Sequence, residues 1–190
     1  MMWRFDRFGD AAALLDEHGQ SLTYAQLARE GEALCGAIGG RCLCFGLCGN
    51  TIGSAVGYAG MVEGGVVPAL LAASIDRELF AALYEAYHPA YLWAPEGFEW
   101  EACESVYERF GYRLLKTPFG TETKLHDDLA LLLTTSGSTG SPKFVRQSYA
   151  NIRANTESIV EYLALTAQEK PITTLPMNYT YGLSILNTHL

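Results

Sequence analysis

Basic residues are scarce in this 190-residue sequence. It has 13 Lys and Arg against 21 Asp and Glu, which gives a formal net charge of −8 at pH 7. Proteins that bind nucleic acid usually present a basic face to the phosphate backbone. The acidic balance therefore argues against a nucleic-acid partner. With 49% hydrophobic residues, the chain has enough apolar material for the core of one sizeable domain.

The sequence also lacks a long, uninterrupted apolar run. Its most apolar window, Ile52 to Ala73, is broken by Glu63, by Gly64 and Gly65 and by Pro68. A transmembrane helix needs about 20 predominantly apolar residues in succession, so we expect a helix and then a buried strand, with no membrane span. The N-terminal MMWRFDRFGD carries charges where a signal peptide has its apolar region. We therefore expect no targeting segment and a cytoplasmic location.

A paired set of cysteines is missing as well. The chain has an odd number of them: Cys35, Cys42, Cys44, Cys48 and Cys103. This excludes a full disulfide framework and favours a reducing compartment. A structural zinc site needs four ligands at recognisable spacing, and no histidine lies near these cysteines. Cys42 and Cys44 would share one face of a strand, so we expect core packing and no metal site.

Histidine is rare too, with four in the chain. None of them forms a recognisable Ser–His–carboxylate set, and no pair of acidic residues can be argued from spacing. The sequence therefore leaves catalytic residues unassigned.

What the sequence does contain is a regular alternation of strand and helix patterns. A capping box at Thr23 and Gln26 predicts a helix to about Ile38, and Asn50 is the predicted cap of a helix to about Glu63. The other predicted helices are 79–87, ended by Pro89, then 103–110, 149–165 and 183–190. The predicted strands and extended segments are 11–15, 21–23, 43–47, 66–70, 91–94, 112–116, 131–133, 144–145 and 172–175. This order predicts an α/β fold with a mostly parallel sheet covered by helices.

One stretch organises the rest of the chain. Leu131 to Leu133 reads as a strand buried on both faces. Thr134 to Ser141 are all small hydroxyl residues or glycines, and Pro142 and Lys143 complete the glycine–serine loop, residues 134–143. Backbone N–H groups and hydroxyls in such a loop can form a nest for phosphate oxygens, with the lysine as a point charge. The alternative is an ordinary surface turn.

The glycine–serine loop fits neither of the common nucleotide motifs. Gly137 and Gly140 lack the earlier partner glycine of the dinucleotide fingerprint, and Pro142 stands where the Walker motif has glycine before lysine. The loop, TTSGSTGSPK, instead resembles the phosphate-binding signature of the adenylate-forming superfamily of acyl-CoA synthetases, aryl-CoA ligases and adenylation domains. It departs at Phe144, where the family usually has glycine. The resemblance implies phosphate contacts from Thr134, Thr135, Ser136, Gly137, Ser138, Thr139, Gly140 and Lys143.

Two further segments resemble the same family. Residues 21–27 contain its opening Leu-Thr-Tyr phrase, and residues 176–183 read PMNYTYGL, a proline followed by an aromatic residue and a glycine. The resemblance places Tyr179 and Gly182 beside the acyl substrate. Without it, Tyr179 reads as a half-buried aromatic residue at a helix entry. Tyr149 stands where the family commonly has histidine.

The resemblance implies a reaction in which ATP, with Mg²⁺, adenylates a carboxylic acid, usually before transfer to the thiol of coenzyme A or a carrier protein. Family members are much longer than this chain. Residues 1–190 would then be a single, incomplete N-terminal AMP-binding domain. We expect it to be inactive by itself, because it lacks the family's aspartate for the ribose and its C-terminal lysine. The alternatives are a non-catalytic nucleotide- or phosphate-binding module and a fragment that binds nothing. We expect self-association, with the apolar side of the helix 183–190 as one contact.

Overall fold

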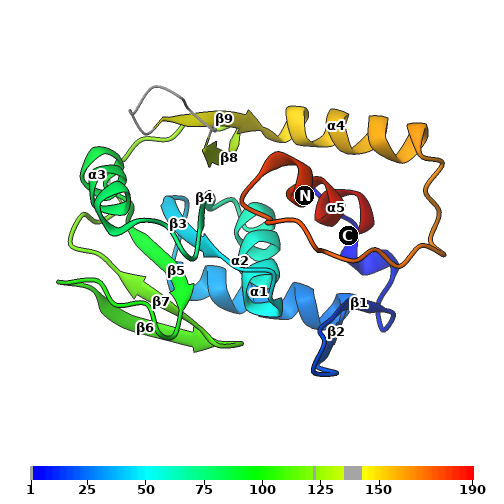
Figure 1. Ribbon diagram of the computed structural model, residues 1–190, viewed down its shortest axis with the longest axis horizontal. Helices are drawn as coiled ribbons and strands as arrows, with labels where there is room; N and C mark the ends of the chain where they lie inside the picture. The colour runs from blue at the N-terminus through cyan, green and yellow to red at the C-terminus, as the bar shows by residue number, and fades with distance from the viewer. Residues whose placement is uncertain (1, 122, 135–142) are drawn as a thin grey trace.

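The structure of the chain, a computed structural model, describes residues 2–121, 123–134 and 143–190. Within these residues the strands form a two-stranded ribbon and a seven-stranded sheet, against which the helices pack (Figure 1). The strands are β1 (Ala12–Leu15), β2 (Ser21–Thr23), β3 (Leu43–Cys48), β4 (Val67–Ala72), β5 (Tyr91–Pro95), β6 (Glu104–Arg109), β7 (Tyr112–Lys116), β8 (Leu129–Thr134) and β9 (Phe144–Ser148). The helices are the 3-10 helix η1 (Phe5–Arg7), α1 (Tyr24–Ile38), α2 (Ile52–Glu63), α3 (Arg77–Tyr87), α4 (Tyr149–Tyr162) and α5 (Thr180–His189).

The large sheet has a parallel centre and antiparallel edges. Its strand order is β6-β7-β5-β3-β4-β8-β9. The pairs β3–β4, β3–β5 and β4–β8 are parallel, whereas β5–β7, β6–β7 and β8–β9 are antiparallel. Helix α2 connects β3 with β4, and helix α3 connects β4 with β5, as in βαβ crossovers. The predicted α/β class with a helix-covered parallel sheet is confirmed, and antiparallel strands close it on both sides.

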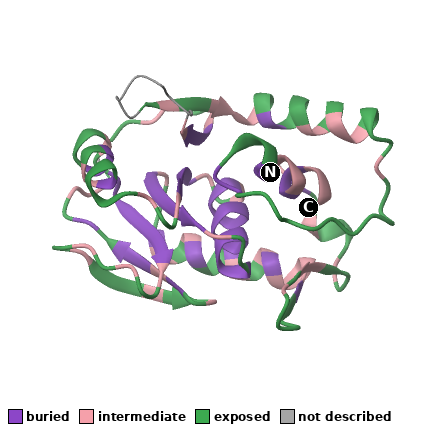
Figure 2. Cartoon of the chain, in the orientation of Figure 1, coloured by how far each residue is buried: buried purple, intermediate pink, exposed green. Residues whose placement is uncertain are grey.

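The central strands are buried on both faces, as Figure 2 shows. In β8, Leu131 and Leu133 pack in the cluster that contains α2 and α5, while Leu132 packs in the cluster that contains α3. Successive side chains of a strand point to opposite faces. The predicted burial of the Leu131–Leu133 run on both sides is therefore confirmed, and the run places the glycine–serine loop at the end of a rigid strand.

The cysteines are all free, and Cys42, Cys44 and Cys48 are buried. Cys42 and Cys44 lie in one apolar cluster together with Leu34 and Trp93, so their predicted core role is confirmed. Desolvation by burial raises the pKa of the Cys48 thiol to about 12. A thiol is reactive as its thiolate, and a thiol with so high a pKa stays protonated at neutral pH. Cys48 therefore packs as a small apolar side chain.

The start of α1 agrees with the sequence. The Thr23 hydroxyl accepts from the Gln26 backbone N–H at 3.2 Å, and the Gln26 side chain accepts from the Thr23 N–H at 2.7 Å. The end of α3 agrees too, since the helix stops at Tyr87 and His88 follows in the left-handed region.

The predicted helix over 103–110 is wrong. This segment contains β6, which pairs antiparallel with β7. Phe110 and Gly111 join the two strands with φ of 52° and 70°, as the type I′ turn of a two-residue hairpin requires. Figure 2 shows β6 as largely exposed. An exposed edge strand lacks the alternation of apolar and polar residues that would have indicated it.

The predicted cap at Asn50 is also wrong. Thr51 is the N-cap of α2, because its hydroxyl accepts from the Ser54 N–H at 3.3 Å. The Asn50 side-chain amide instead donates to the carbonyl oxygens of Thr173, at 2.7 Å, and Leu175, at 3.0 Å. Asn and Thr are both good caps, so the choice between adjacent residues depended on what lies beside Asn50.

The C-terminal helix differs from its prediction. Helix α5 begins at Thr180, and Leu183 and Leu186 are buried in the cluster built around α2. Its expected role as an unpartnered apolar surface is wrong for these two residues. Residues 172–175, which precede it, belong to no strand. Among the described residues, no helix is both long and apolar enough to cross a membrane.

Candidate functional site

The glycine–serine loop connects β8 with β9. Thr134 is the last residue of β8 and pairs with Phe144, the first residue of β9. Thr134 is half-buried and Lys143 is exposed. The other predicted phosphate contacts lie outside the described residues: Thr135, Ser136, Gly137, Ser138, Thr139 and Gly140. The described ends show where the loop leaves and rejoins the sheet.

This position is the carboxyl end of the parallel strands. Strand β8 pairs with β4, with Leu133 beside Leu70, and β4 in turn pairs with β3. All three strands run in the same direction, so their carboxyl ends meet at one edge of the sheet. In open α/β sheets, ligands bind in the crevice at this edge. The two described ends of the glycine–serine loop, Thr134 and Lys143, therefore lie where the fold favours a ligand.

The segment that carries Tyr179 is held against the same edge. Asn50 follows β3, and its amide donates to two carbonyl groups of the segment, those of Thr173 and Leu175. A Cβ on Gly182 would lie 2.2 Å from the carbonyl oxygen of Pro176 and 2.7 Å from that of Leu175. Only glycine allows this close approach. The predicted Tyr179 and Gly182 thus belong to a segment whose backbone is fixed beside the end of β3.

Tyr179 is the N-cap residue of α5 and is 48% exposed. Its backbone N–H donates to the carbonyl oxygen of Pro176 at 3.2 Å. Gly182 is buried in the first turn of the helix. The tyrosine therefore has a fixed backbone and a side chain that solvent, or another group, can reach.

Buried polar contacts fix the far end of α5. The Tyr58 hydroxyl donates to Asn187 Oδ1 at 2.7 Å, and Trp3 Nε1 donates to the Asn187 carbonyl oxygen at 3.3 Å. Desolvation by burial raises the pKa of the Tyr58 phenol well above its usual value. Sequence reasoning gave Asn50 the wrong role, that of a helix cap, and missed Asn187, because the partners of both residues are distant in the chain.

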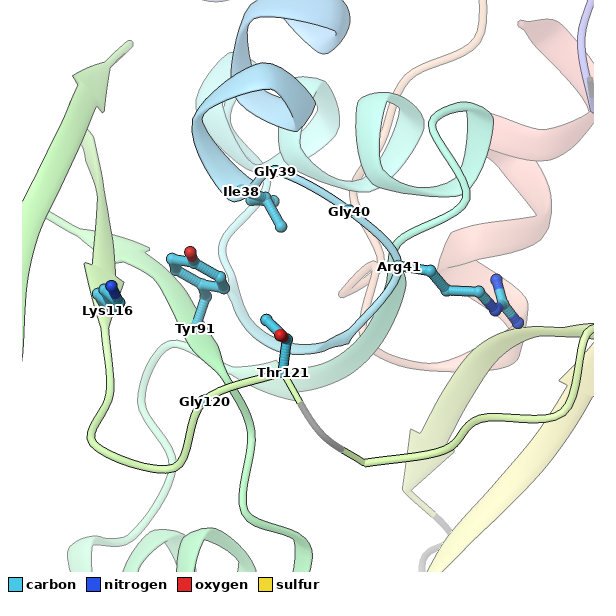
Figure 3. A pocket seen from close by; sticks show the side chains of 8 residues that line it. All are labelled: Ile38, Gly39, Gly40, Arg41, Tyr91, Lys116, Gly120 and Thr121. Carbon is cyan, nitrogen blue, oxygen red and sulfur yellow. The ribbon is translucent and has the colours of Figure 1, made fainter.

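A separate cavity of about 340 Å³ lies at the other edge of the sheet. Tyr91, which lines it, is the first residue of β5, so the cavity opens at the amino ends of the parallel strands. In Figure 3 the Arg41 guanidinium points away from the other labelled side chains. It donates to the carbonyl oxygens of Gly65 and Leu129, each at 2.7 Å. Arg41 is therefore occupied with backbone groups, and the cavity lies at the opposite edge of the sheet from Thr134 and Lys143.

The described residues contain no group of three or more His, Cys, Asp or Glu side chains that could hold a metal ion. A magnesium ion in a nucleotide reaction usually arrives with the phosphates and keeps several waters. A magnesium ion carried by ATP therefore needs no preformed cluster of protein ligands among the described residues.

The helix-covered parallel sheet, with a glycine–serine loop after a central strand, is an arrangement typical of nucleotide-binding α/β proteins. The sequence matches the AMP-binding enzyme family over residues 76–190. The chain belongs to this family, and the resemblance to adenylate-forming enzymes is confirmed.

Curated relatives are similar along most of the chain. A mitochondrial malonate–CoA ligase from Bos taurus is 27% identical over 204 residues, covering 94% of this chain and 34% of the relative. The Homo sapiens enzyme of that name is 27% identical over 201 residues, covering 92% of this chain and 34% of the relative. The chain thus spans about a third of the length of these relatives.

Solved structures agree in fold. O-succinylbenzoate coenzyme A synthetase from Bacillus subtilis, in complex with ATP and magnesium ion, has a TM-score of 0.76 and 21% identity. That match covers 96% of this chain and 52% of the synthetase chain. A malonyl-CoA ligase in a ternary product complex with methylmalonyl-CoA and AMP has a TM-score of 0.75 and 26% identity, covering 95% and 39% of the two chains. The chain has the fold of the N-terminal part of such synthetases.

Proposed function

We propose that this chain is the phosphate-binding part of an ATP-dependent acid–thiol ligase. In that reaction a carboxylic acid and ATP give an acyl-adenylate and pyrophosphate, and a thiol then takes the acyl group. The observation that carries the proposal is the TTSGSTGSPK loop, which follows a strand buried on both faces and returns to the sheet at its carboxyl edge. Membership of the AMP-binding enzyme family supports it.

In this proposal the residues 134–140 and Lys143 form the cradle for the ATP phosphates. Backbone N–H groups and hydroxyls donate to phosphate oxygens, and the Lys143 ammonium neutralises charge that develops on the departing pyrophosphate. Thr134 stands at the end of β8 and Lys143 directly before β9, so the two ends of the cradle are fixed by the β8–β9 pairing. Magnesium would enter bound to the ATP phosphates.

Tyr179 and Gly182 would border the acyl group. The relatives are named malonate–CoA ligases, and one solved relative holds methylmalonyl-CoA and AMP. Malonate and methylmalonate are therefore the first acids to test, and coenzyme A is the first thiol. A carrier-protein thiol is the alternative acceptor.

We further propose that residues 1–190 are one incomplete N-terminal AMP-binding domain. The 34% coverage of the relatives supports this, as does the exposure of large apolar side chains near α5. The same coverage favours one second candidate, a module that binds nucleotide or phosphate without chemistry. The relatives are named as mitochondrial, whereas the sequence favours the cytoplasm, so the location stays a prediction.

Isothermal titration with ATP and Mg²⁺ tests the common part of both candidates. We expect saturable binding by the purified chain. Because catalysis by residues 1–190 alone is not expected, malonate-dependent pyrophosphate release by a longer protein that contains this chain then separates a ligase from a binding module. An absence of ATP binding would leave the chain as a structural fragment and overturn both candidates.

A further inference from the structure

The exit of the glycine–serine loop is tied to a helix that precedes it by a long stretch of chain. The backbone N–H of Phe144 donates to the Tyr87 hydroxyl at 3.3 Å, a contact between residues 57 positions apart. Tyr87 is the last residue of α3, and His88 closes the helix with its N–H on the Tyr84 carbonyl oxygen at 3.0 Å. The hydroxyl is therefore presented by the fixed end of a packed helix.

The aromatic rings strengthen this tie. The Tyr87 and Phe144 ring centroids are 4.8 Å apart, with the planes at 73°. Phe144 also lies edge-to-face with Phe45, at 5.8 Å. Phe45 is fully buried in β3. Edge-to-face pairs of this kind add to the stability that burial provides, so Phe144 is held from two sides.

Strand β9, which follows the glycine–serine loop, has a strand partner on one side only. It is the edge strand of the sheet, beside β8. Groups on the outer side of an edge strand lack a strand partner, and strand ends fray readily. Val145 and Arg146 are exposed, so Phe144 is the residue of this strand end that packs inward. Lys143 is the residue directly before Phe144, so the Cα atoms of the two residues are about 3.8 Å apart.

We propose that Tyr87 is a positioning residue for Lys143, at the exit of the glycine–serine loop. Its hydroxyl and ring hold Phe144, and Phe144 holds the backbone of Lys143 at the carboxyl edge of β8. This inference rests on the proposed phosphate-binding function and extends it to a residue outside the loop. A lysine whose backbone is already in place loses less conformational freedom when it meets a phosphate. The family's signature usually has glycine at the position of Phe144. The phenylalanine supplies a ring that packs against the ring of Tyr87.

Tyr87→Phe removes the hydroxyl and keeps the ring, so it isolates the hydrogen bond. We expect hydrogen exchange at the Phe144 amide to become at least about tenfold faster, because the amide loses its acceptor. The Kd for ATP with Mg²⁺ should rise about three- to tenfold, the range for one lost neutral hydrogen bond. Tyr149→Phe is the matched control: it also deletes a tyrosine hydroxyl that bonds a backbone group, the Val62 carbonyl at 3.2 Å. It should leave both quantities within about twofold.

A double-mutant cycle separates positioning from a general loss of stability. If Tyr87 acts through Lys143, Tyr87→Phe should change the Kd by less than about twofold in the Lys143→Ala background. Full additivity, an unchanged Kd in Tyr87→Phe, or unchanged exchange at Phe144 would each overturn the inference. A wild-type chain that binds no ATP would instead overturn the proposed function, and exchange at Phe144 would still decide whether Tyr87 holds the loop exit.

Discussion

Gly31 of α1 and Gly60 of α2 touch through their backbones where the two helices cross. A Cβ on Gly31 would lie 2.7 Å from the Gly60 Cα, and a Cβ on Gly60 would lie 2.5 Å from the Gly31 Cα. Both distances are too short for a real side chain. The contact lets α1 sit directly on α2, which is itself buried against the sheet. The layer that supports the central strands therefore depends on two glycines.

Replacement of Gly60 by alanine should destabilise the fold. The added methyl group must displace the backbone of α1, so we expect a loss of about 2–3 kcal/mol in the free energy of unfolding. Thermal or urea denaturation measures it. Gly36→Ala is the control, because Gly36 is an exposed glycine of α1 with open space around its Cβ position. That variant should gain up to about 1 kcal/mol from helix propensity. Equal effects of the two changes would contradict the close crossing.

Asn50→Asp should release the segment before Tyr179. An aspartate cannot donate, and its charge would face the carbonyl groups of Thr173 and Leu175. We expect a loss of about 1–2 kcal/mol and faster hydrogen exchange between residues 173 and 182. Thr51→Ala removes the neighbouring cap of α2, which costs about 1 kcal/mol, and its exchange changes should stay in the first turn of α2. If both variants gave the same exchange pattern, the role assigned to Asn50 would be lost.

Lys143→Ala should weaken ATP binding. A hydrogen bond to a charged group contributes about 1.5–3 kcal/mol, so the Kd should rise by about one to two orders of magnitude. Titration calorimetry gives the value. Lys116→Ala is the control, since Lys116 is an exposed lysine paired with Tyr91 at the opposite edge of the sheet. Unchanged affinity in Lys143→Ala would remove this lysine from the cradle.

Catalysis by residues 1–190 alone is not expected. The family groups for the ribose and the mobile C-terminal lysine have no match in the chain, which covers 34% of its curated relatives. Carboxylate-dependent ATP–pyrophosphate exchange should therefore stay at background with malonate or methylmalonate. Robust exchange by a contaminant-free preparation, abolished by Lys143→Ala, would show that the catalytic groups lie within these residues.

Self-association stays a prediction, with a different surface from the one that the sequence suggested. Tyr162, Ile172 and Tyr181 are 88%, 76% and 74% exposed, and they lie between the end of α4 and the start of α5. Apolar groups of this size favour contact with another surface. Light scattering at micromolar concentration should show a dimer or a larger species, and Ile172→Glu should shift it toward the monomer. Leu15→Glu changes another exposed apolar residue, 73% accessible on β1, and should not. A monomeric wild-type chain would refute the prediction.

Local sequence patterns were enough to predict several elements of this protein. The capping box of Thr23 and Gln26, the Leu131–Leu133 strand and the residues of the glycine–serine loop could all be recognised within a few positions of each other. These features depend on backbone geometry and on runs of apolar residues, which neighbouring residues determine. The family followed from the same short stretch, and the comparisons confirmed it.

Contacts between distant residues were decided only by the tertiary structure. Residues 104–109, within the predicted helix, form a strand that pairs with β7. Thr51, and not Asn50, caps α2, because the Asn50 amide donates to the carbonyl groups of Thr173 and Leu175. The tie between Tyr87 and Phe144 spans 57 positions. A hydrogen bond or a strand pair between distant residues forms only where the fold brings the two partners together. The sequence around one partner does not indicate where the other partner will lie.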